Sequence, residues 1–275
     1  MLPMNENLSL GFSPCPNDTY AFHAMQHGRV DTGGYHFVSH IDDVESLNHA
    51  ALQGTYKLSK LSFHAYLHLA GRYTLLDAGS ALGFGCGPLV VARSALADLE
   101  GARIAIPGEM TTAYLLFRLW NRADTDIRMA RFDEILEGVA GGRFDAGLII
   151  HEGRFVYPRF GLEKIVDLGE WWEAETGLPI PLGCIAMRVD GGDYDRVRAS
   201  EFTRIIRASV RHALDNPEDS REFVRAHARE MDDDVVRRHI GLYVNDFTLD
   251  LGETGRRAIQ TLEEMARCRG ILEPA

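Results

Sequence analysis

The chain has 275 residues, of which 45% are hydrophobic and 25% charged, as is usual for a folded globular protein and not for a disordered one. The formal net charge of −11 argues against a nucleic-acid partner, because phosphate binding requires a clustered basic face. The cysteines are widely spaced and contain no CxxC pair, so they predict neither a zinc site nor a disulfide scaffold (Cys15, Cys86, Cys184 and Cys268).

The hydropathy of the chain and its first residues bear on where the protein works. No window reaches the roughly 18 apolar residues of a membrane helix. The opening segment "MLPMNENLSLGFSPCPND" lacks the basic start and long apolar stretch of a secretory signal. We therefore expect a cytoplasmic protein without a membrane partner.

The first part of the chain predicts alternating strands and helices. Strands are expected at "NLSLGFS" and "YHFVSHI", and helices at "TYAFHAMQHG" and "DVESLNHAALQG". Asn17 or Asp18 is expected to cap the first helix and Asp43 the second, with a glycine at the end of each. A short extended piece then turns helical near Ser62, and a glycine-rich loop leads into the apolar strand "PLVVA".

A second series of elements follows. Strands are expected at "ARIAIPG", "IRMARF" and "DAGLIIH", and helices at "EMTTAYLLFRLWNR" and "DEILEGVAGGRF". This alternation with short loops is typical of parallel α/β units. Another apolar strand, "PLGCIAMRV", comes next, and the chain from about residue 191 is helical by pattern.

The two apolar strands around the second series indicate the domain organisation. A chain that leaves one domain, builds another and returns needs two crossings, and "GPLVVARS" and "PLGCIAMRV" bracket the second block. We expect an α/β fold with a larger discontinuous lobe (1–92 and 187–275) and a smaller inserted lobe (93–186). The two strands would form a hinge, with a ligand cleft between the lobes.

Polar residues gather where the first strand ends, in "GFSPCPNDT". Ser13, Asn17 and Asp18 crowd a turn that leads into a helix, and ligands of parallel α/β lobes bind at the carboxyl ends of strands. A rigid turn with a helix cap is the alternative explanation. Cys15 is either a nucleophile activated by the helix dipole or a small residue buried between two prolines.

Two further motifs could hold an anion. Thr111 and Thr112 in "AIPGEMTTAY" fall at the start of a helix, where free N–H groups and two hydroxyls suit a carboxylate or phosphate, although an ordinary cap needs one hydroxyl. In "KLSKLSFHAY", Lys60 and Ser62 would offer a cation and a hydroxyl to an acidic ligand. The alternative for Lys60 is a solvated surface lysine.

His151 ends the apolar run of "GLIIHEGRF", at the expected tip of a core strand. It either caps the strand and faces water or is presented to a ligand, where a histidine suits general base catalysis. Glu152 would point to the other side of such a strand.

No metal or nucleotide site is expected. The pairs His23/His27 and His64/His68 have helical spacing, but no HExxH motif occurs, so solvated helix faces explain them better. The glycines of "LGFGCGP" precede a strand instead of following one, so the dinucleotide fingerprint fails.

Together, several motifs identify a family. "LGFSPCPNDT", "SKLSFHAY", "IPGEMTTAYLL", "GLIIHEGRFVYPRFGL", "VDLGEWWEAETGLPIPLGCI" and "YVNDFTLDLGE" occur in one order from about residue 8 to 255. They resemble the 1,4-dihydroxy-6-naphthoate synthase family of the futalosine route to menaquinone. The resemblance implies a two-lobed fold like the type II periplasmic binding proteins.

The resemblance also implies an activity. Cyclic dehypoxanthinyl futalosine, a small-molecule carboxylate, would be cleaved to 1,4-dihydroxy-6-naphthoate with release of dihydroxyacetone, without an organic cofactor or metal. His151 would be the proton acceptor, and the ligand would contact the "KLS" residues and the threonine pair (Lys60, Leu61, Ser62, Thr111 and Thr112).

Two other functions stay open on the sequence. One is a non-catalytic protein of the same fold that binds a small carboxylate, and the other is the sister enzyme that dehydrates chorismate. A thiol enzyme that uses Cys15 is a more distant alternative. The sequence is compatible with a monomer and with a homodimer.

Overall fold

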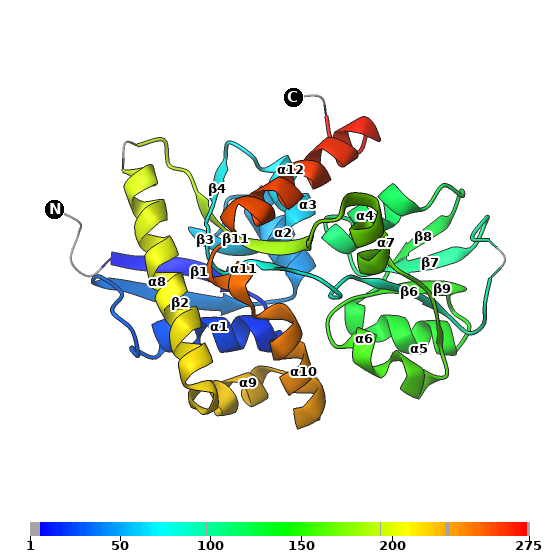
Figure 1. The fold of residues 1–275 in the computed structure, drawn as a ribbon, viewed down its shortest axis with the longest axis horizontal. Coiled ribbons are helices and arrows are strands. Elements are labelled where there is room, and N and C mark those ends of the chain that lie inside the picture. Colours follow the sequence, from blue (N-terminus) through cyan, green and yellow to red (C-terminus); the bar gives the residue numbers. More distant parts are fainter. Residues whose placement is uncertain (1–5, 97, 193, 229–231, 274–275) are drawn as a thin grey trace. The chain divides into compact units, whose positions relative to one another are not determined.

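The computed structural model describes residues 6–96, 98–192, 194–228 and 232–273. By its internal contacts the chain divides into two compact units, unit 1 (Met1–Leu82 and Gly183–Glu253) and unit 2 (Gly83–Leu182 and Thr254–Ala275). Each unit is built on its own β-sheet (Figure 1). The predicted α/β class is confirmed. Within the described ranges, no helix is long and apolar enough to cross a membrane.

The sheet of unit 1 has the strand order β2-β1-β3-β11-β4, and β5 also pairs with β11. β1 runs parallel to both β2 and β3, whereas β11 is antiparallel to β3 and β4. The parallel strands therefore all end at one edge of the sheet. The strands are β1 (Glu6–Phe12), β2 (Tyr35–Ile41), β3 (Leu58–Ser62), β4 (Tyr73–Leu75), β5 (Ala81–Gly83) and β11 (Ile180–Arg188).

Helices cover both faces of this sheet. α1 packs against α8, α9 and α10, and α2 packs against β3 and β1 (Figure 1). Phe12, Phe22 and Phe202 are among the fully buried side chains of this core. The helices are α1 (Pro16–Gln26), α2 (Val44–Leu52), α3 (Phe63–His68), α8 (Asp195–Asp215), the 3₁₀ helix η3 (Pro217–Ser220), α9 (Arg221–His227), α10 (Asp233–Tyr243) and α11 (Asp246–Leu249).

Unit 2 has a sheet with the strand order β10-β6-β9-β7-β8. β7 is parallel to β8 and β9, and β6 is antiparallel to its neighbours β9 and β10. The carboxyl ends of β7, β8, β9 and β10 and the amino end of β6 thus share one edge. The strands are β6 (Leu89–Ala92), β7 (Arg103–Ile106), β8 (Asp126–Met129), β9 (Ala146–Ile149) and β10 (Glu163–Asp167).

The helices of unit 2 also lie on both faces of their sheet, with α4 and α7 on one face and α5 and α6 on the other (Figure 1). Trp172 of α7 is fully buried, and its indole N–H donates to the Pro179 carbonyl at 3.1 Å. The helices are α4 (Thr112–Trp120), the 3₁₀ helix η1 (Phe132–Glu134), α5 (Ile135–Ala140), α6 (Gly153–Val156), the 3₁₀ helix η2 (Tyr157–Phe160), α7 (Leu168–Thr176) and α12 (Gly252–Cys268), of which α12 begins in unit 1.

The boundaries between the units differ from those expected at residues 92 and 187. β6 pairs with β9 and β10, so it belongs to the sheet of unit 2 and cannot be a hinge strand paired with β11. The chain passes between the units at 82/83 and 182/183, within β5 and β11, which pair with each other. The last residues also return to unit 2, where the Arg269 guanidinium donates to the Arg118 carbonyl in α4 and to the Asn121 carbonyl directly after it.

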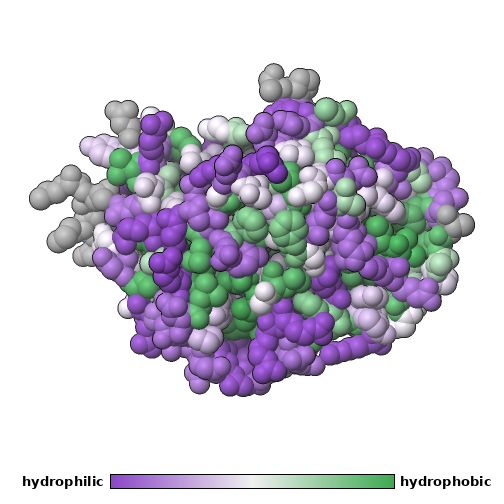
Figure 2. All heavy atoms as spheres, viewed as in Figure 1, coloured by the Kyte–Doolittle hydropathy of each residue, from purple (hydrophilic) through white to green (hydrophobic). Residues whose placement is uncertain are grey.

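Hydrophilic residues predominate on the face drawn in Figure 2, and the hydrophobic ones appear as patches between them. The large apolar side chains with substantial exposure come from several elements of both units (Val38, Phe84, Met129, Phe160, Tyr194, Val197 and Leu214). These side chains are spread along the chain and do not come from a single segment.

Candidate functional site

In unit 1, the "SPCPND" and "KLS" motifs lie at the same edge of the sheet. Ser13 to Asp18 follow the carboxyl end of β1, and Lys60 to Ser62 form the carboxyl end of β3, its parallel neighbour. The structure thus brings together two groups of residues that are more than 40 positions apart in the chain.

Asp18 is the centre of this cluster. Its carboxylate accepts from the Ser13 hydroxyl at 2.7 Å, the Ser13 N–H at 3.2 Å, the Asn17 amide at 2.8 Å and the Lys60 ammonium at 2.7 Å. Asp18 is not the predicted helix cap, because Cys15 holds the N-cap position of α1. Both carboxylate oxygens are occupied by protein donors, so Asp18 and Ser13 support Lys60 instead of presenting free groups to a ligand.

Lys60 is not a solvated surface lysine. Its side chain is 8% exposed and that of Asp18 is 2% exposed. An ammonium has three hydrogens to donate, and in the described part of the chain Asp18 is its one acceptor. A buried cation with two unused donors needs an external acceptor, water or a ligand, because burying polar hydrogens without a partner is costly. Lys60 therefore remains a candidate for binding an acidic group.

Further buried polar residues support the cluster, and the sequence did not single them out. The Nε2 of His239, in α10, lies 2.9 Å from the Asn17 amide oxygen. Asn48, in α2, accepts from the Ser62 N–H at 2.9 Å and donates to the Ser62 hydroxyl at 3.2 Å. Both residues are buried on helices distant in sequence, and an isolated histidine or asparagine in a helix carries no local signal of such a contact.

Leu61 has a different place from its neighbours in the "KLS" motif. Its side chain is fully buried, and its backbone pairs with Cys184 of β11. Any contact of Leu61 with a ligand would therefore pass through its backbone.

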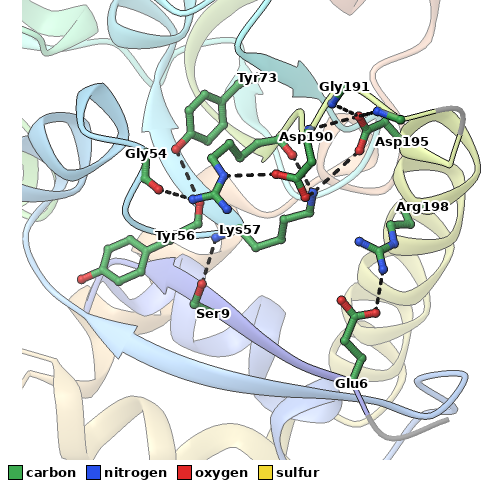
Figure 3. Close-up of polar contacts among 12 residues, drawn as sticks. Glu6, Ser9, Gly54, Tyr56, Lys57, Tyr73, Asp190, Gly191, Asp195 and Arg198 are labelled. Carbon is green, nitrogen blue, oxygen red and sulfur yellow. Dashed lines mark hydrogen bonds and ion pairs between the residues drawn. The ribbon is translucent and has the colours of Figure 1, made fainter. Parts of the chain in front are cut away.

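Lys57 lies at the other end of β3. Its ammonium donates to the Asp190 carboxylate at 2.7 Å and to the Arg188 carbonyl at 2.8 Å, with Asp195 at 3.8 Å (Figure 3). The hydrogen bond from Lys57 lowers the pKa of Asp190 below its usual value. The two lysines of "KLSKLS" thus lie at opposite edges of the sheet.

In unit 2, the threonine pair follows the carboxyl end of β7. Thr111 caps α4: its hydroxyl accepts from the Tyr114 N–H at 3.2 Å and donates to the Gly108 carbonyl at 2.7 Å. The Thr112 hydroxyl donates to the Leu182 carbonyl at 2.6 Å. Both hydroxyl hydrogens are therefore used within the protein, and the donors that α4 can offer to an anion are its first backbone N–H groups.

His151 lies at the same edge of this sheet, because β9 is parallel to β7. β9 ends at Ile149, so His151 and Glu152 follow the strand in a turn instead of alternating along it as predicted. In the described ranges, His151 is the one non-glycine residue with positive φ, at 55°. Its ring is half-buried and contacts Phe132 edge-on, with ring centroids 5.1 Å apart.

The predicted solvated histidine faces are wrong for two of the four residues. His23 and His64 are buried, and their rings contact His27 and His68, respectively. No cluster of three or more potential metal ligands occurs in the residues that the structure describes. Cys15 is buried as well, in line with the interpretation of a small residue between two prolines.

Comparison with known proteins places the chain in a family. The family model for menaquinone biosynthesis matches residues 8–268. The chain belongs to this menaquinone biosynthesis family. It is 49% identical over 270 residues to the 1,4-dihydroxy-6-naphthoate synthase of Thermus thermophilus, covering 98% of this chain and 97% of the relative. It is 47% identical over 273 residues to the enzyme of the same name from Streptomyces coelicolor, covering 97% and 95%.

Solved structures agree with the fold expected for the family. Protein AF1704 of Archaeoglobus fulgidus matches with a TM-score of 0.91 at 37% identity, covering 97% of this chain and 98% of that one. The alkanesulfonate-binding protein SsuA of Xanthomonas axonopodis matches with a TM-score of 0.74 at 14% identity, covering 99% and 96%. The chain therefore has the fold of the periplasmic binding proteins, which confirms the predicted fold class.

Proposed function

We propose that this protein is a carbon–carbon lyase that converts cyclic dehypoxanthinyl futalosine to 1,4-dihydroxy-6-naphthoate and dihydroxyacetone. The observation that carries the proposal is the identity of 49% and 47%, over nearly the full length, to two proteins named 1,4-dihydroxy-6-naphthoate synthase. The arrangement of polar groups in each unit is compatible with this chemistry.

His151 is the proposed general base. It removes a proton from the substrate, which starts ring opening and cleavage of a carbon–carbon bond, and formation of an aromatic ring favours the later steps. A positioned base typically contributes about 10² to 10⁴-fold to a rate. The remaining acceleration is assigned to binding and orientation of the substrate.

Lys60 and the amino end of α4 are the proposed groups for the acidic parts of the substrate. Lys60 supplies two ammonium hydrogens that no described protein group accepts. The first N–H groups of α4 suit a carboxylate, because the helix dipole places positive charge at that end. Asp18 holds Lys60 and is itself held by Ser13 and Asn17, and Asn48 holds Ser62.

The test is to incubate the protein with cyclic dehypoxanthinyl futalosine and, separately, with chorismate, and to follow both by chromatography. We expect the naphthoate and dihydroxyacetone in equal amounts from the first and no reaction of the second. Tight binding of the first without product would indicate the carboxylate-binding protein, and dehydration of chorismate would indicate the sister enzyme.

A further inference from the structure

The turn that holds His151 requires support from its surroundings. A left-handed backbone is strained for residues with a Cβ, and strained residues persist where the surrounding structure fixes them. Backbone hydrogen bonds within the segment include those from the Gly153 N–H to the Ile150 carbonyl at 3.1 Å and from the Phe155 N–H to the Glu152 carbonyl at 2.9 Å. A side chain on the segment that follows, Arg154, adds a contact to the rest of the unit.

Arg154 connects this segment to the rest of the sheet edge. It lies three residues after His151, in the single turn of α6. Its Nη2 donates to the Asp167 carboxylate at 2.5 Å, and its Nε donates to the Gly87 carbonyl at 3.3 Å. The side chains of Arg154 and Asp167 are 16% and 5% exposed, so solvent screens the pair only weakly.

The strand register explains how one side chain reaches both partners. Asp167 of β10 is paired with Leu89 of β6, and Leu89 is paired with Ile149 of β9, so the three residues form one row across the edge. Arg154, just beyond β9, therefore spans the amino end of β6 to reach the carboxyl end of β10.

A close approach of two glycines completes the arrangement. A Cβ at Gly87 would lie 2.2 Å from the Gly169 nitrogen, so only glycine allows the start of β6 to touch the start of α7. Asp167 also caps α7, accepting from the Gly169 N–H at 2.8 Å. Asp167 is thereby fixed independently of Arg154 and forms a rigid anchor.

We propose that Arg154, anchored by Asp167 and the Gly87 carbonyl, is a positioning residue for His151. It acts through the backbone: by tying α6 to a rigid anchor, it holds the left-handed turn and with it the direction of the imidazole. This inference rests on the proposed role of His151 as the base. A misplaced base lowers the rate of the chemical step more than it weakens substrate binding.

The experiment compares Arg154→Ala and Arg154→Lys with Arg103→Ala in steady-state turnover of cyclic dehypoxanthinyl futalosine. Arg103 is the matched control, because it makes a two-pronged ion pair with Asp145 in the same unit, at 2.8 and 3.0 Å, but at the opposite edge of the sheet. We expect Arg154→Ala to lower kcat by about 10 to 10²-fold with KM nearly unchanged. Arg154→Lys should recover part of kcat, and Arg103→Ala should keep all of it.

A double mutant separates positioning from a general effect on structure. If Arg154 acts through His151, His151→Asn with Arg154→Ala is no slower than His151→Asn alone, whereas independent effects multiply. Equal kcat for Arg154→Ala and Arg103→Ala, a change confined to KM, or multiplying effects would each overturn the inference. Full activity of His151→Asn would instead contradict the proposed base, so the two failures are distinguishable.

Discussion

His151 combines a proposed chemical role with an unfavourable backbone. Its φ of 55° lies in the left-handed region. This conformation is unfavourable by about 1–2 kcal/mol for a residue with a Cβ and nearly neutral for glycine. Strain of this kind at a strand end is characteristic of functional positions. A substitution of His151 that relieves this strain should therefore raise the stability of the fold and lower the activity.

The first prediction compares His151→Gly with His151→Ala. Both variants lose the imidazole, so the difference between them isolates the backbone. We expect the glycine variant to be more stable by about 1 kcal/mol in urea denaturation, because glycine accepts the left-handed conformation. Ala140→Gly, at the end of helix α5, should instead lower the stability, because glycine is less favourable than alanine in a helix. A glycine variant that is less stable than the alanine variant would contradict the strained turn.

The ion pair of Asp18 and Lys60 is the second residue-scale feature. Removing one partner of a buried pair leaves an uncompensated charge, which typically costs about 3–5 kcal/mol. The pair of Asp190 and Lys57 has the same 2.7 Å separation, but its aspartate is 48% exposed. Lys57 also keeps the Arg188 carbonyl as an acceptor.

We therefore predict that Asp18→Asn lowers the free energy of unfolding by about 3 kcal/mol or more, and Asp190→Asn by about 1 kcal/mol or less. Chemical denaturation of the two variants beside the wild type measures both values. Similar losses for the two variants would show that the Lys60 ammonium is well solvated and not buried as described.

At the scale of elements, several helices begin on a carboxylate cap. Asp43 accepts from the Glu45 and Ser46 N–H groups at the start of α2, at 3.0 and 3.1 Å. Burial alone would raise the pKa of Asp43, but the hydrogen bonds from Ser46 and Glu45 outweigh it and lower that pKa below its usual value. A carboxyl with a lowered folded-state pKa stabilises the fold above its unfolded-state pKa of about 3.9, and this contribution disappears as the pH falls through the folded-state value.

Asp43→Ala should cost about 1 kcal/mol at pH 7, and its deficit relative to the wild type should shrink as the pH falls from about 4 through the lowered folded-state pKa, below which the wild-type carboxyl is protonated. Asp43→Asn, which can cap without titrating, should cost little at pH 7. Thermal unfolding of the three proteins across this pH range provides the test, and a deficit independent of pH would contradict it.

Elements with a clear local pattern could be predicted from the sequence, whereas elements that depend on pairing with distant strands could not. The alternation in "YHFVSHI" predicted β2 at its observed bounds, and Asp43 is the cap that its position predicted. The strands β4 and β5 have three residues each, too few for a pattern, and they exist through pairing with β11. The hinge was assigned wrongly because "PLVVA" has the composition of any buried strand, and composition does not select a partner.

The site shows the same division. The sequence predicted Thr111 and Thr112 at the start of a helix and His151 at the tip of a strand. In the structure Thr111 caps α4, and His151 lies two residues beyond the end of β9. The sequence could not reveal the left-handed turn at His151 or the direction of the threonine hydroxyls, because backbone turns and hydrogen-bond partners depend on the folded surroundings.

At the scale of the whole molecule, the four cysteines differ in their exposure to solvent. Cys268 is exposed, whereas Cys15, Cys86 and Cys184 are buried. Burial raises the pKa of both Cys86 and Cys184 to about 12, so neither is a thiolate at neutral pH. We predict that a thiol reagent at pH 8 modifies one cysteine rapidly in the native protein and four after unfolding. Rapid reaction of a second native thiol would contradict the burial and revive thiol chemistry at Cys15.

The proposed role of His151 as the base of the reaction can be tested directly. Asparagine is the sharpest replacement, because it tolerates the left-handed backbone but cannot accept the proton. The decisive measurement is kcat of His151→Asn with cyclic dehypoxanthinyl futalosine at saturation, with binding of the substrate checked by calorimetry. We expect a loss of about 10² to 10⁴-fold in kcat with binding preserved. A variant that binds the substrate and turns it over as fast as the wild type would contradict it.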